Sequence, residues 1–263
     1  MTGAGGSGPW VVIVDAGVGN LGNVERALAH LGATAEISSD PARVSAARCL
    51  VLPGVGAFGP PREALRGPLE AALAAALADG AWLLGICVGF QLLFETSDEF
   101  GVTDGLGLLP GRVTRLPAGV PVPHIGWNRL HGLADHPLLA GLGAGEVACG
   151  EDAGAEEAAG EEAGGEDAGA EEALGGEAGG KQAAGGGEAG RRGRHFYFVH
   201  SFAPEGVPAE VCLARASHGR DFAAVAARGR VMGTQFHPER SGTAGLRLLA
   251  NFLEIADGTA AGH

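Results

Sequence analysis

A cysteine between two glycines carries the clearest chemical signal in this sequence. Cys87 is the central residue of Gly85-Ile86-Cys87-Val88-Gly89, which directly follows an apolar stretch and precedes a run with helical spacing. A nucleophile on such a sharp strand-to-helix turn has its side chain pushed out of the sheet, and the glycines relieve the crowding. The helix N-terminus favours a thiolate, and the amide of Val88 points toward a developing oxyanion. The alternative is a buried structural cysteine in a glycine-bounded turn.

A histidine and a glutamate near the C-terminus complete the chemistry that such a cysteine needs. His237, Pro238 and Glu239 follow an apolar stretch at residues 231–236, and the proline fixes the backbone between the two polar side chains. A thiol needs a base to become a good nucleophile, and the base needs a carboxylate that holds its tautomer and ring orientation. Taken alone, His237 is better explained as a hydrogen-bonded surface histidine. Together with Cys87, it predicts a Cys-His-Glu triad that splits an amide.

A glycine-rich turn at residues 53–56 offers a second donor for an oxyanion hole. The turn reads Pro53-Gly54-Val55-Gly56 and follows the third predicted strand, at the carboxyl edge where open α/β sheets place their sites. Glycines on both sides of Val55 allow a backbone conformation that turns an amide toward the reacting carbonyl. An ordinary strand-ending turn is the alternative. The sequence has no P-loop or dinucleotide-binding pattern, so we expect no cofactor of that kind.

These residues lie between stretches whose hydrophobic patterns predict alternating strands and helices. In the first half, strands are expected at residues 10–15, 35–38, 49–52 and 82–86, and helices at 20–30, 61–78 and 90–94. In the second half, strands are expected at 112–116, 125–130, 196–201, 211–217, 222–227 and 231–235, before a last helix at 243–255. This order predicts an α/β fold with a mostly parallel central sheet, helices on both faces and an antiparallel extension.

Composition and charge argue against several classes of function. The formal net charge of −13 disfavours nucleic-acid binding, because phosphates require a positive field. The four cysteines lack metal-ligand spacing, and the first residues lack a signal-peptide pattern, so we expect a cytoplasmic protein without a metal site. The most apolar window, residues 83–94, is too short to span a bilayer. Cys49 and Cys212 are expected in the core.

Residues 145–194 differ in composition from the rest of the chain. They hold 13 of the 31 acidic residues, 4 of the 18 basic residues and 16 of the 48 glycines. The segments 151–165 and 166–180 match at 13 of 15 positions, but neither has an apolar face on which a repeat could stack. The composition favours a disordered acidic insertion, and an interaction tail is the alternative. We therefore expect one domain over residues 10–257, interrupted at 145–194, with flexible ends at 1–9 and 258–263.

Six sequence blocks in the same order resemble the class I (triad) glutamine amidotransferases, and within them the glutaminase subunits of imidazole glycerol phosphate synthase. The similarity runs from about residue 11 to residue 253 and leaves out the insertion. The elbow that ends in Gln91 and the closing residues 237–239 belong to the wider class. The blocks more particular to these glutaminase subunits are residues 19–21, 53–56, 123–128, 196–201 and 235–242.

The resemblance implies a flavodoxin-like fold that hydrolyses glutamine to glutamate and ammonia through a γ-glutamyl thioester on Cys87. Ammonia would pass to a separate cyclase subunit of (β/α)8 barrel fold, the two forming a heterodimer. The cyclase would combine it with a phosphoribulosyl aminoimidazole carboxamide ribonucleotide. The products would be imidazole glycerol phosphate and an aminoimidazole carboxamide ribonucleotide (AICAR), in histidine biosynthesis. No cofactor is implied.

By position, the resemblance also assigns roles to residues outside the triad. Glutamine binding falls to Gly54, Gln91, Glu99, Ser201 and Phe202. Contacts with the cyclase fall to Asn20, Trp127 and Arg240. Two departures are evident: Phe202 stands where tyrosine is commoner, so a hydroxyl is absent, and relatives have only a short connection in place of the insertion.

Three other functions remain open at this point. A different cysteine hydrolase of the same fold, peptidase-like or deglycase-like, would lack the His-Pro-Glu ending and Gln91. A glutaminase for another acceptor, in pyridoxal phosphate or anthranilate synthesis, is nearer, and residues 123–128 and 196–201 argue against it. A catalytically silent module that regulates a partner barrel would resist labelling of Cys87 by a glutamine-like electrophile.

Overall fold

A large, mostly parallel sheet forms the centre of the structure. The computed structural model describes residues 9–143 and 194–258, and the main sheet has the strand order β11-β12-β13-β4-β3-β1-β2. The last five strands of this order run parallel, whereas β12 and β11 are antiparallel additions at one edge. The strand bounds are β1 (Trp10–Val14), β2 (Thr34–Ser38), β3 (Cys49–Gly54), β4 (Trp82–Cys87), β11 (Cys212–Ser217), β12 (Asp221–Arg228) and β13 (Val231–Thr234). The parallel centre and the antiparallel extension agree with the sequence prediction.

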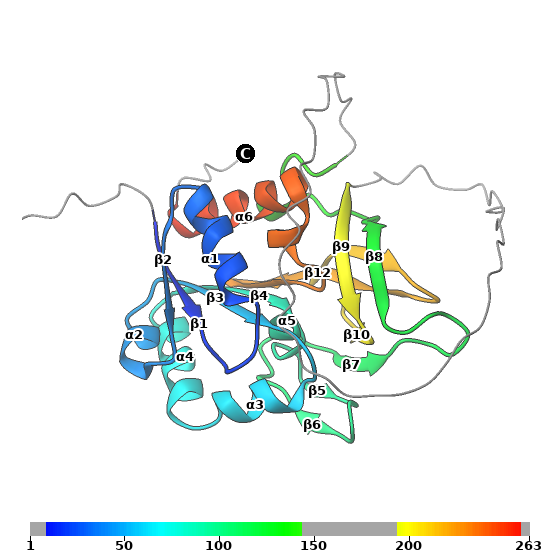
Figure 1. The fold of residues 1–263 in the computed structure, drawn as a ribbon, viewed down its shortest axis with the longest axis horizontal. Helices are drawn as coiled ribbons and strands as arrows, with labels where there is room; N and C mark the ends of the chain where they lie inside the picture. The colour runs from blue at the N-terminus through cyan, green and yellow to red at the C-terminus, as the bar shows by residue number, and fades with distance from the viewer. Residues whose placement is uncertain (1–8, 144–193, 259–263) are drawn as a thin grey trace, which may run out of the picture. The chain divides into compact units, whose positions relative to one another are not determined.

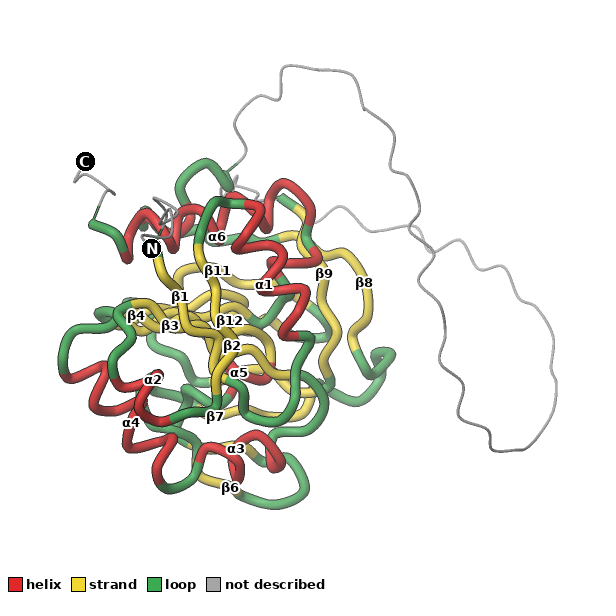
Figure 2. The backbone as a smooth tube through the Cα atoms, turned by 60° about the vertical axis from the view of Figure 1, so that its left-hand side comes forward, coloured by secondary structure: helices red, strands yellow, loops and turns green. Residues whose placement is uncertain are grey.

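Helices cover both faces of this sheet, as the sequence predicted. Figure 1 shows α1 and α6 on one face and α2 and α4 on the other, and the second view agrees (Figure 2). Each longer helix buries one side of its surface, for example Val24 and Leu28 in α1 and Leu69 and Leu73 in α4. The helix bounds are α1 (Leu21–His30), α2 (Pro41–Ser45), α3 (Gly59–Leu65), α4 (Pro68–Ala78) and α6 (Gly242–Ala256). With both faces shielded, the central strands β3 and β4 are almost wholly buried.

The single long helix expected at residues 61–78 is wrong, because α3 and α4 are separate helices. Gly67 between them has a φ of +83°, and Pro68 is the first residue of α4. A residue before proline is disfavoured in the helical region, and proline has no N–H to continue a helix, so the chain turns there. The two helices stay together through Arg62, which donates two hydrogen bonds to the Glu70 carboxylate, at 2.8 and 3.0 Å.

Two smaller sheets accompany the central one. One has the strand order β10-β7-β5-β6, and the other pairs β8 with β9 in antiparallel register. Their strand bounds are β5 (Thr96–Ser97), β6 (Thr103–Asp104), β7 (Arg112–Arg115), β8 (His124–Arg129), β9 (His195–His200) and β10 (Phe202–Glu205), and a 3-10 turn, η1, covers Pro137–Leu139. The sequence predicted β7, β8 and β9 but not β5, β6, β10 or α2. The missed elements have two to five residues, and segments this short show little periodic hydrophobic pattern.

The carboxyl ends of three neighbouring parallel strands meet at one edge of the central sheet. Gly54 at the end of β3 pairs with Cys87 at the end of β4, and Thr234 at the end of β13 pairs with Ile86. The residues that follow β13 are therefore carried to the same place as the turn after β4. Distant parts of the sequence thus converge where open α/β sheets bind their ligands.

Parts of the domain prediction concern residues that lie outside the described ones. Except for residues 9, 194 and 258, the expected flexible ends at 1–9 and 258–263 and the expected disordered insertion at 145–194 lie outside the described residues. One domain over residues 10–257 with an acidic insertion stays a prediction. Within the described ranges, no helix is both long and apolar enough to cross a membrane. The same ranges contain no cluster of His, Cys, Asp or Glu side chains arranged to hold a metal ion.

Candidate active site

Cys87 stands on a strained turn between β4 and the short helix α5 (Val88–Gln91). Its φ is +55°, a left-handed conformation that non-glycine residues seldom adopt. The glycines on either side are required by close packing. A Cβ on Gly89 would lie 1.8 Å from the carbonyl oxygen of Leu52, and a Cβ on Gly85 would lie 2.7 Å from the Cα of Phe90. The turn therefore lets the elbow press against β3 and presents the thiol at the sheet edge.

His237 and Glu239 form a buried pair just beyond β13. The Nδ1 of His237 lies 2.8 Å from the Oε1 of Glu239, and the two side chains are only 5% and 2% exposed. Both residues belong to a turn that includes the 3-10 segment η2 (Pro238–Arg240). The backbone N–H of His237 donates to the carbonyl of Tyr197 at 3.0 Å, and the Ser241 hydroxyl donates to the carbonyl of His237 at 2.6 Å. These bonds fix the imidazole against β9 with its Nδ1 held by the carboxylate.

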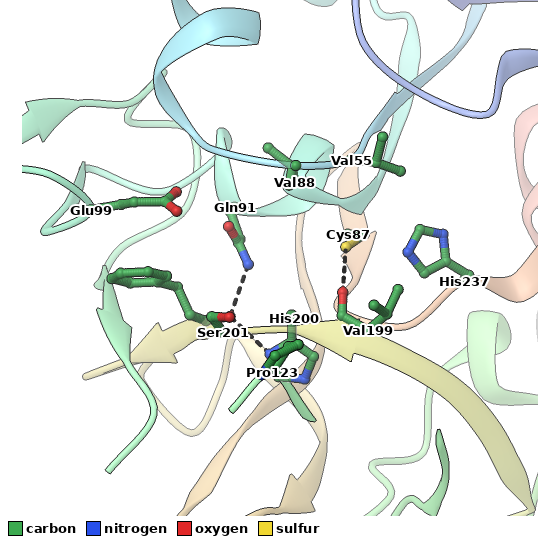
Figure 3. Close-up of a pocket in the computed structure, with 12 residues that line it drawn as sticks. Val55, Cys87, Val88, Gln91, Glu99, Pro123, Val199, His200, Ser201 and His237 are labelled. Carbon is green, nitrogen blue, oxygen red and sulfur yellow. Dashed lines mark hydrogen bonds between the residues drawn. The ribbon is translucent and has the colours of Figure 1, made fainter. Parts of the chain in front are cut away.

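The other ring nitrogen of His237, Nε2, is left free by the pair with Glu239. Figure 3 shows the imidazole beside the Cys87 sulfur, and both residues line one cavity. The Nε2 is buried and has no hydrogen-bond partner among the described residues. Burial alone would lower the pKa of His237, but the adjacent Cys87 thiolate and the Glu239 carboxylate outweigh it and raise that pKa to about 10.

His237 is expected to remain protonated until about pH 10, because the neighbouring thiolate stabilises the imidazolium. Nitrogen NMR of histidine-labelled protein across a pH titration measures this directly. The Cys87→Ala variant removes the negative sulfur, so the transition of His237 should move to lower pH in that protein. A His237 that titrates near its ordinary value of 6.5 in the wild-type chain contradicts this electrostatic account.

The cavity has a volume of about 220 Å³ and brings together most of the predicted site residues. Its lining includes Val55, Cys87, Val88, Gln91, Glu99, Ser201, Phe202 and His237, together with Gly56, Pro123, Val199 and His200. Figure 3 shows Glu99 and Gln91 at one end and the thiol and imidazole at the other. The space suits a small molecule that has a polar group at each end.

The residues predicted to bind glutamine reach the cavity in different ways. Glu99 is held in place because its Oε2 accepts a hydrogen bond from the backbone N–H of Phe58 at 2.7 Å. The side-chain nitrogen of Gln91 donates to the carbonyl of Phe202 at 2.9 Å and to the Oε1 of Gln235 at 3.1 Å. Both N–H groups of Gln91 are thus used within the protein, which leaves its carbonyl oxygen for a ligand.

The glycine-rich turn after β3 contributes to the cavity through one of its two predicted residues. Val55 lines the cavity together with Cys87 and Val88, and the residue is 37% exposed. Gly54 lies outside the lining, and a Cβ there would be 2.8 Å from the backbone nitrogen of Gly89. The structure thus places Gly54 against the elbow, where it allows β3 and the turn to approach closely.

Comparison with known proteins identifies the family. The sequence model described as "Glutamine amidotransferase class-I" matches residues 12–256. The chain belongs to this family. Solved structures agree on the fold: "Crystal structure of glutamine amidotransferase" aligns with a TM-score of 0.60 at 20% identity, over 94% of this chain and 98% of that one. "Structure of PurLQS from Thermotoga maritima" aligns with a TM-score of 0.61 at 18% identity, over 94% and 99%.

Curated relatives of this amidotransferase agree in their description. Each of the three that follow is named "Imidazole glycerol phosphate synthase subunit HisH". The protein of Symbiobacterium thermophilum is 42% identical, over 92% of each chain. That of Geobacillus kaustophilus is 39% identical, over 94% of this chain and 97% of its own, and that of Salinibacter ruber is 37% identical, over 95% and 97%. The resemblance predicted from the sequence blocks is confirmed.

The residues predicted to face a cyclase are not among those that line the amidotransferase cavity. Trp127 is 57% exposed and packs edge-to-face on Tyr197, with ring centroids 6.0 Å apart. The guanidinium of Arg240 lies 4.3 Å from the centroid of the same Tyr197 ring. Asn20 is exposed at the N-terminus of α1, where its side chain accepts a hydrogen bond from the backbone of Asn23. Trp127 and Arg240 thus form one aromatic and cationic surface with Tyr197, and α1 packs beside η2, which carries Arg240.

Sequence reasoning missed two polar groups next to the thiol of this amidotransferase. Gln235 is fully buried, and its side-chain nitrogen lies 3.8 Å from the Cys87 sulfur. The carbonyl of Val199 lies 3.7 Å from the same sulfur. Gln235 was visible only as part of a sequence block, since one glutamine after an apolar strand indicates no role. Backbone carbonyls leave no trace in a sequence.

Proposed function

We propose that the chain is the glutaminase subunit of an imidazole glycerol phosphate synthase. It hydrolyses glutamine to glutamate and ammonia. The observation that carries this proposal is the Cys87-His237-Glu239 arrangement at a cavity, in a chain 37–42% identical to HisH subunits over more than nine-tenths of its length. The names of these relatives favour the use of the ammonia in imidazole glycerol phosphate synthesis over its use in pyridoxal phosphate or anthranilate synthesis.

The first half of the reaction forms a thioester and releases ammonia. The Cys87 sulfur attacks the side-chain amide carbon of glutamine and forms a carbon–sulfur bond, and the carbonyl oxygen takes the negative charge. The backbone amides of Val55 and Val88 beside the sulfur are the proposed donors to this oxyanion. When the carbon–nitrogen bond breaks, the protonated Nε2 of His237 gives its proton to the leaving nitrogen.

The second half hydrolyses the γ-glutamyl thioester. His237, now neutral, takes a proton from a water molecule, which attacks the thioester carbon while the carbon–sulfur bond breaks. The products are glutamate and the Cys87 thiolate, and His237 is protonated again. Throughout, Glu239 holds the Nδ1–H of His237 and so keeps Nε2 directed at the sulfur.

The polar end of the cavity fits the amino-acid end of glutamine. The Glu99 carboxylate and the free carbonyl oxygen of Gln91 are both acceptors, which suits the positive α-ammonium group. Ser201 and Phe202 form the wall on the β9–β10 side. Gly54 supports the elbow from behind. With its ammonium held at that end, glutamine would reach Cys87 with its side-chain amide.

The released ammonia is proposed to pass to a separate cyclase subunit with a (β/α)8 barrel fold, in a heterodimer. The cyclase would convert a phosphoribulosyl ribonucleotide into imidazole glycerol phosphate and AICAR, which is lyase chemistry in histidine biosynthesis. The exposed surface of Asn20, Trp127 and Arg240 is the proposed contact region. A cytoplasmic location, without nucleic acid or membrane partners, completes the proposal. It is supported by the acidic charge and by the free, buried thiols of Cys49 and Cys212.

Glutamate formation by the full-length chain, with and without the barrel cyclase of the same genome, tests this proposal. The two proteins should co-purify, and the cyclase with its ribonucleotide ligand should increase the rate of glutamate release. Cys87→Ser is the matched control, because it keeps the shape of the side chain but replaces the thiol, and should release no glutamate above background. Failure of the wild-type complex to release glutamate, together with no labelling of Cys87 by a diazoketone analogue of glutamine, rejects the function.

A further inference from the structure

A pair of buried histidines, one of which lines the cavity, takes no part in the chemistry described above. His124 on β8 and His200 on β9 are cross-strand partners, and each is only 6% exposed. His124 stacks on the ring of His218, with centroids 4.2 Å apart, and His200 meets Phe222 edge-to-face. Polar rings in such surroundings are unfavourable unless their nitrogens find partners.

The contact of His200 with the backbone carbonyl of Phe202 fixes which nitrogens of the two histidines donate and which accept. The Nδ1 of His200 lies 2.8 Å from the carbonyl oxygen of Phe202, which can only accept, so His200 carries its proton on Nδ1. Its Nε2 must then accept from the Nδ1–H of His124 at 3.1 Å. The Nε2 of His124 in turn accepts from the side-chain amide of Asn128 at 3.4 Å. Burial lowers the pKa of His124 to about 4 and that of His200 to about 3, so both rings are neutral near pH 7.

The same carbonyl is where Gln91 is held. The Phe202 carbonyl accepts from Gln91 at 2.9 Å as well as from His200, and Figure 3 draws both bonds. The second N–H of Gln91 is bonded to Gln235, whose own side-chain nitrogen lies 3.8 Å from the Cys87 sulfur. A continuous series of hydrogen bonds therefore runs from the β8–β9 pair to the glutamine-binding side chain and on to the thiol. Such chains polarise and order their members.

We propose that His200, oriented by His124, is a positioning residue for glutamine binding. By holding the Phe202 carbonyl in place, it fixes the amide of Gln91 so that the Gln91 carbonyl oxygen faces the substrate. This inference rests on glutamine being the substrate. It gives Phe202 a role through its backbone carbonyl, which does not depend on a tyrosine hydroxyl.

The alternative is that His200 only packs against its neighbours. Substitutions that remove either the hydrogen bonds or the ring distinguish this role from positioning. Packing against Phe198 and Phe222 requires only an aromatic ring of similar size. The bonds to Phe202 and His124 require one donor and one acceptor. His200→Phe therefore keeps the ring and removes the bonds, whereas His200→Gln keeps one donor and one acceptor and removes the ring.

The experiment compares these two variants in the full-length chain by labelling Cys87 with a diazoketone analogue of glutamine, followed by intact-mass measurement. For His200→Phe, the concentration of reagent at half-saturation should rise about tenfold, the effect of one lost hydrogen bond, and the maximal labelling rate should change by less than about threefold. His200→Gln should lie closer to the wild type. Iodoacetamide, which needs no glutamine pocket, should label Cys87 at the same rate in all three proteins. His218→Phe, a change in the same histidine cluster outside the hydrogen-bond series, is the matched control.

The outcomes distinguish a failure of this inference from a failure of the proposed function. A wild-type chain that the diazoketone does not label rejects the function itself. A labelled wild type with half-saturation unchanged in His200→Phe rejects only the positioning role, as does His200→Gln behaving no better than His200→Phe. If His200→Phe is insoluble, His124→Phe removes the donor to His200 and must show the same loss of affinity, and unchanged half-saturation there overturns the proposal.

Discussion

Replacing His237 by asparagine is expected to lower the kcat of glutamine hydrolysis by about 10³-fold, which corresponds to about 4 kcal/mol of transition-state stabilisation. The asparagine amide can still donate to Glu239, so the buried carboxylate keeps a partner and the turn keeps its conformation. What disappears is the proton donor and acceptor that faces Cys87. Glutamate release by the complex with the cyclase, over a range of glutamine concentrations, measures the effect, and KM should change little.

A second measurement separates two tasks of His237, which are proton transfer during glutamine hydrolysis and activation of the Cys87 thiol. Because asparagine is no base and cannot take the thiol proton, alkylation of Cys87 by iodoacetamide at pH 7 should also slow in His237→Asn. His136→Asn is the control, since His136 caps η1 by accepting from the backbone of Leu138, which asparagine can also do. That variant should match the wild type in both assays. Unchanged glutamate release in His237→Asn would mean that another group acts as the base.

The convergence of Cys87 and His237 could be anticipated from the sequence because it follows from topology. Each residue comes directly after an apolar strand, and in a parallel sheet the carboxyl ends of the strands share one edge. What the sequence could not supply was the strand order, in which β13 lies next to β4 and β3 lies on its other side. That order depends on packing between strands far apart in the chain, whose apolar patterns are alike.

The sequence could not predict the groups that act through a backbone atom or that matter only because the fold buries them in the site. The carbonyl of Phe202 joins His200 to Gln91, yet a carbonyl is present at every position and leaves no pattern. Gln235 became meaningful only when the fold placed it beside the Cys87 sulfur. The break between α3 and α4 was missed for a different reason. The alanine- and leucine-rich composition favours a helix throughout, and the Gly67-Pro68 pair interrupts it through backbone sterics.

These differences share a physical origin. Local patterns report which face of an element is buried, and they place the central strands and the helices α1 and α6 well. The site, in contrast, forms where helices and strands approach one another closely, and its geometry depends on contacts between individual atoms. The elbow shows this most clearly, because its conformation depends on two glycines that permit contact with β3 and α5 rather than on any side-chain chemistry.

Gly89→Ala is therefore expected to have the largest effect on stability of any single added methyl group at the elbow. The new Cβ would lie 1.8 Å from the carbonyl oxygen of Leu52, a backbone atom that cannot move without disturbing β3. Relief requires the elbow to separate from the strand, at a free-energy cost of about 3 kcal/mol or more. Urea unfolding should show this as a lower midpoint with an unchanged slope. Cys87 labelling should fall in the fraction that stays folded, because the thiol moves away from His237.

The matched control is Gly59→Ala in α3, where an added Cβ meets no atom within 4 Å. Alanine there should be neutral or stabilise the protein slightly, since it lowers the conformational entropy of the unfolded chain. Comparing Gly89→Ala with Gly59→Ala thus separates the effect of adding any methyl group from the effect of adding it at the elbow. If Gly89→Ala unfolds at the same urea concentration as Gly59→Ala and labels at the wild-type rate, the elbow does not rest on β3 as closely as described.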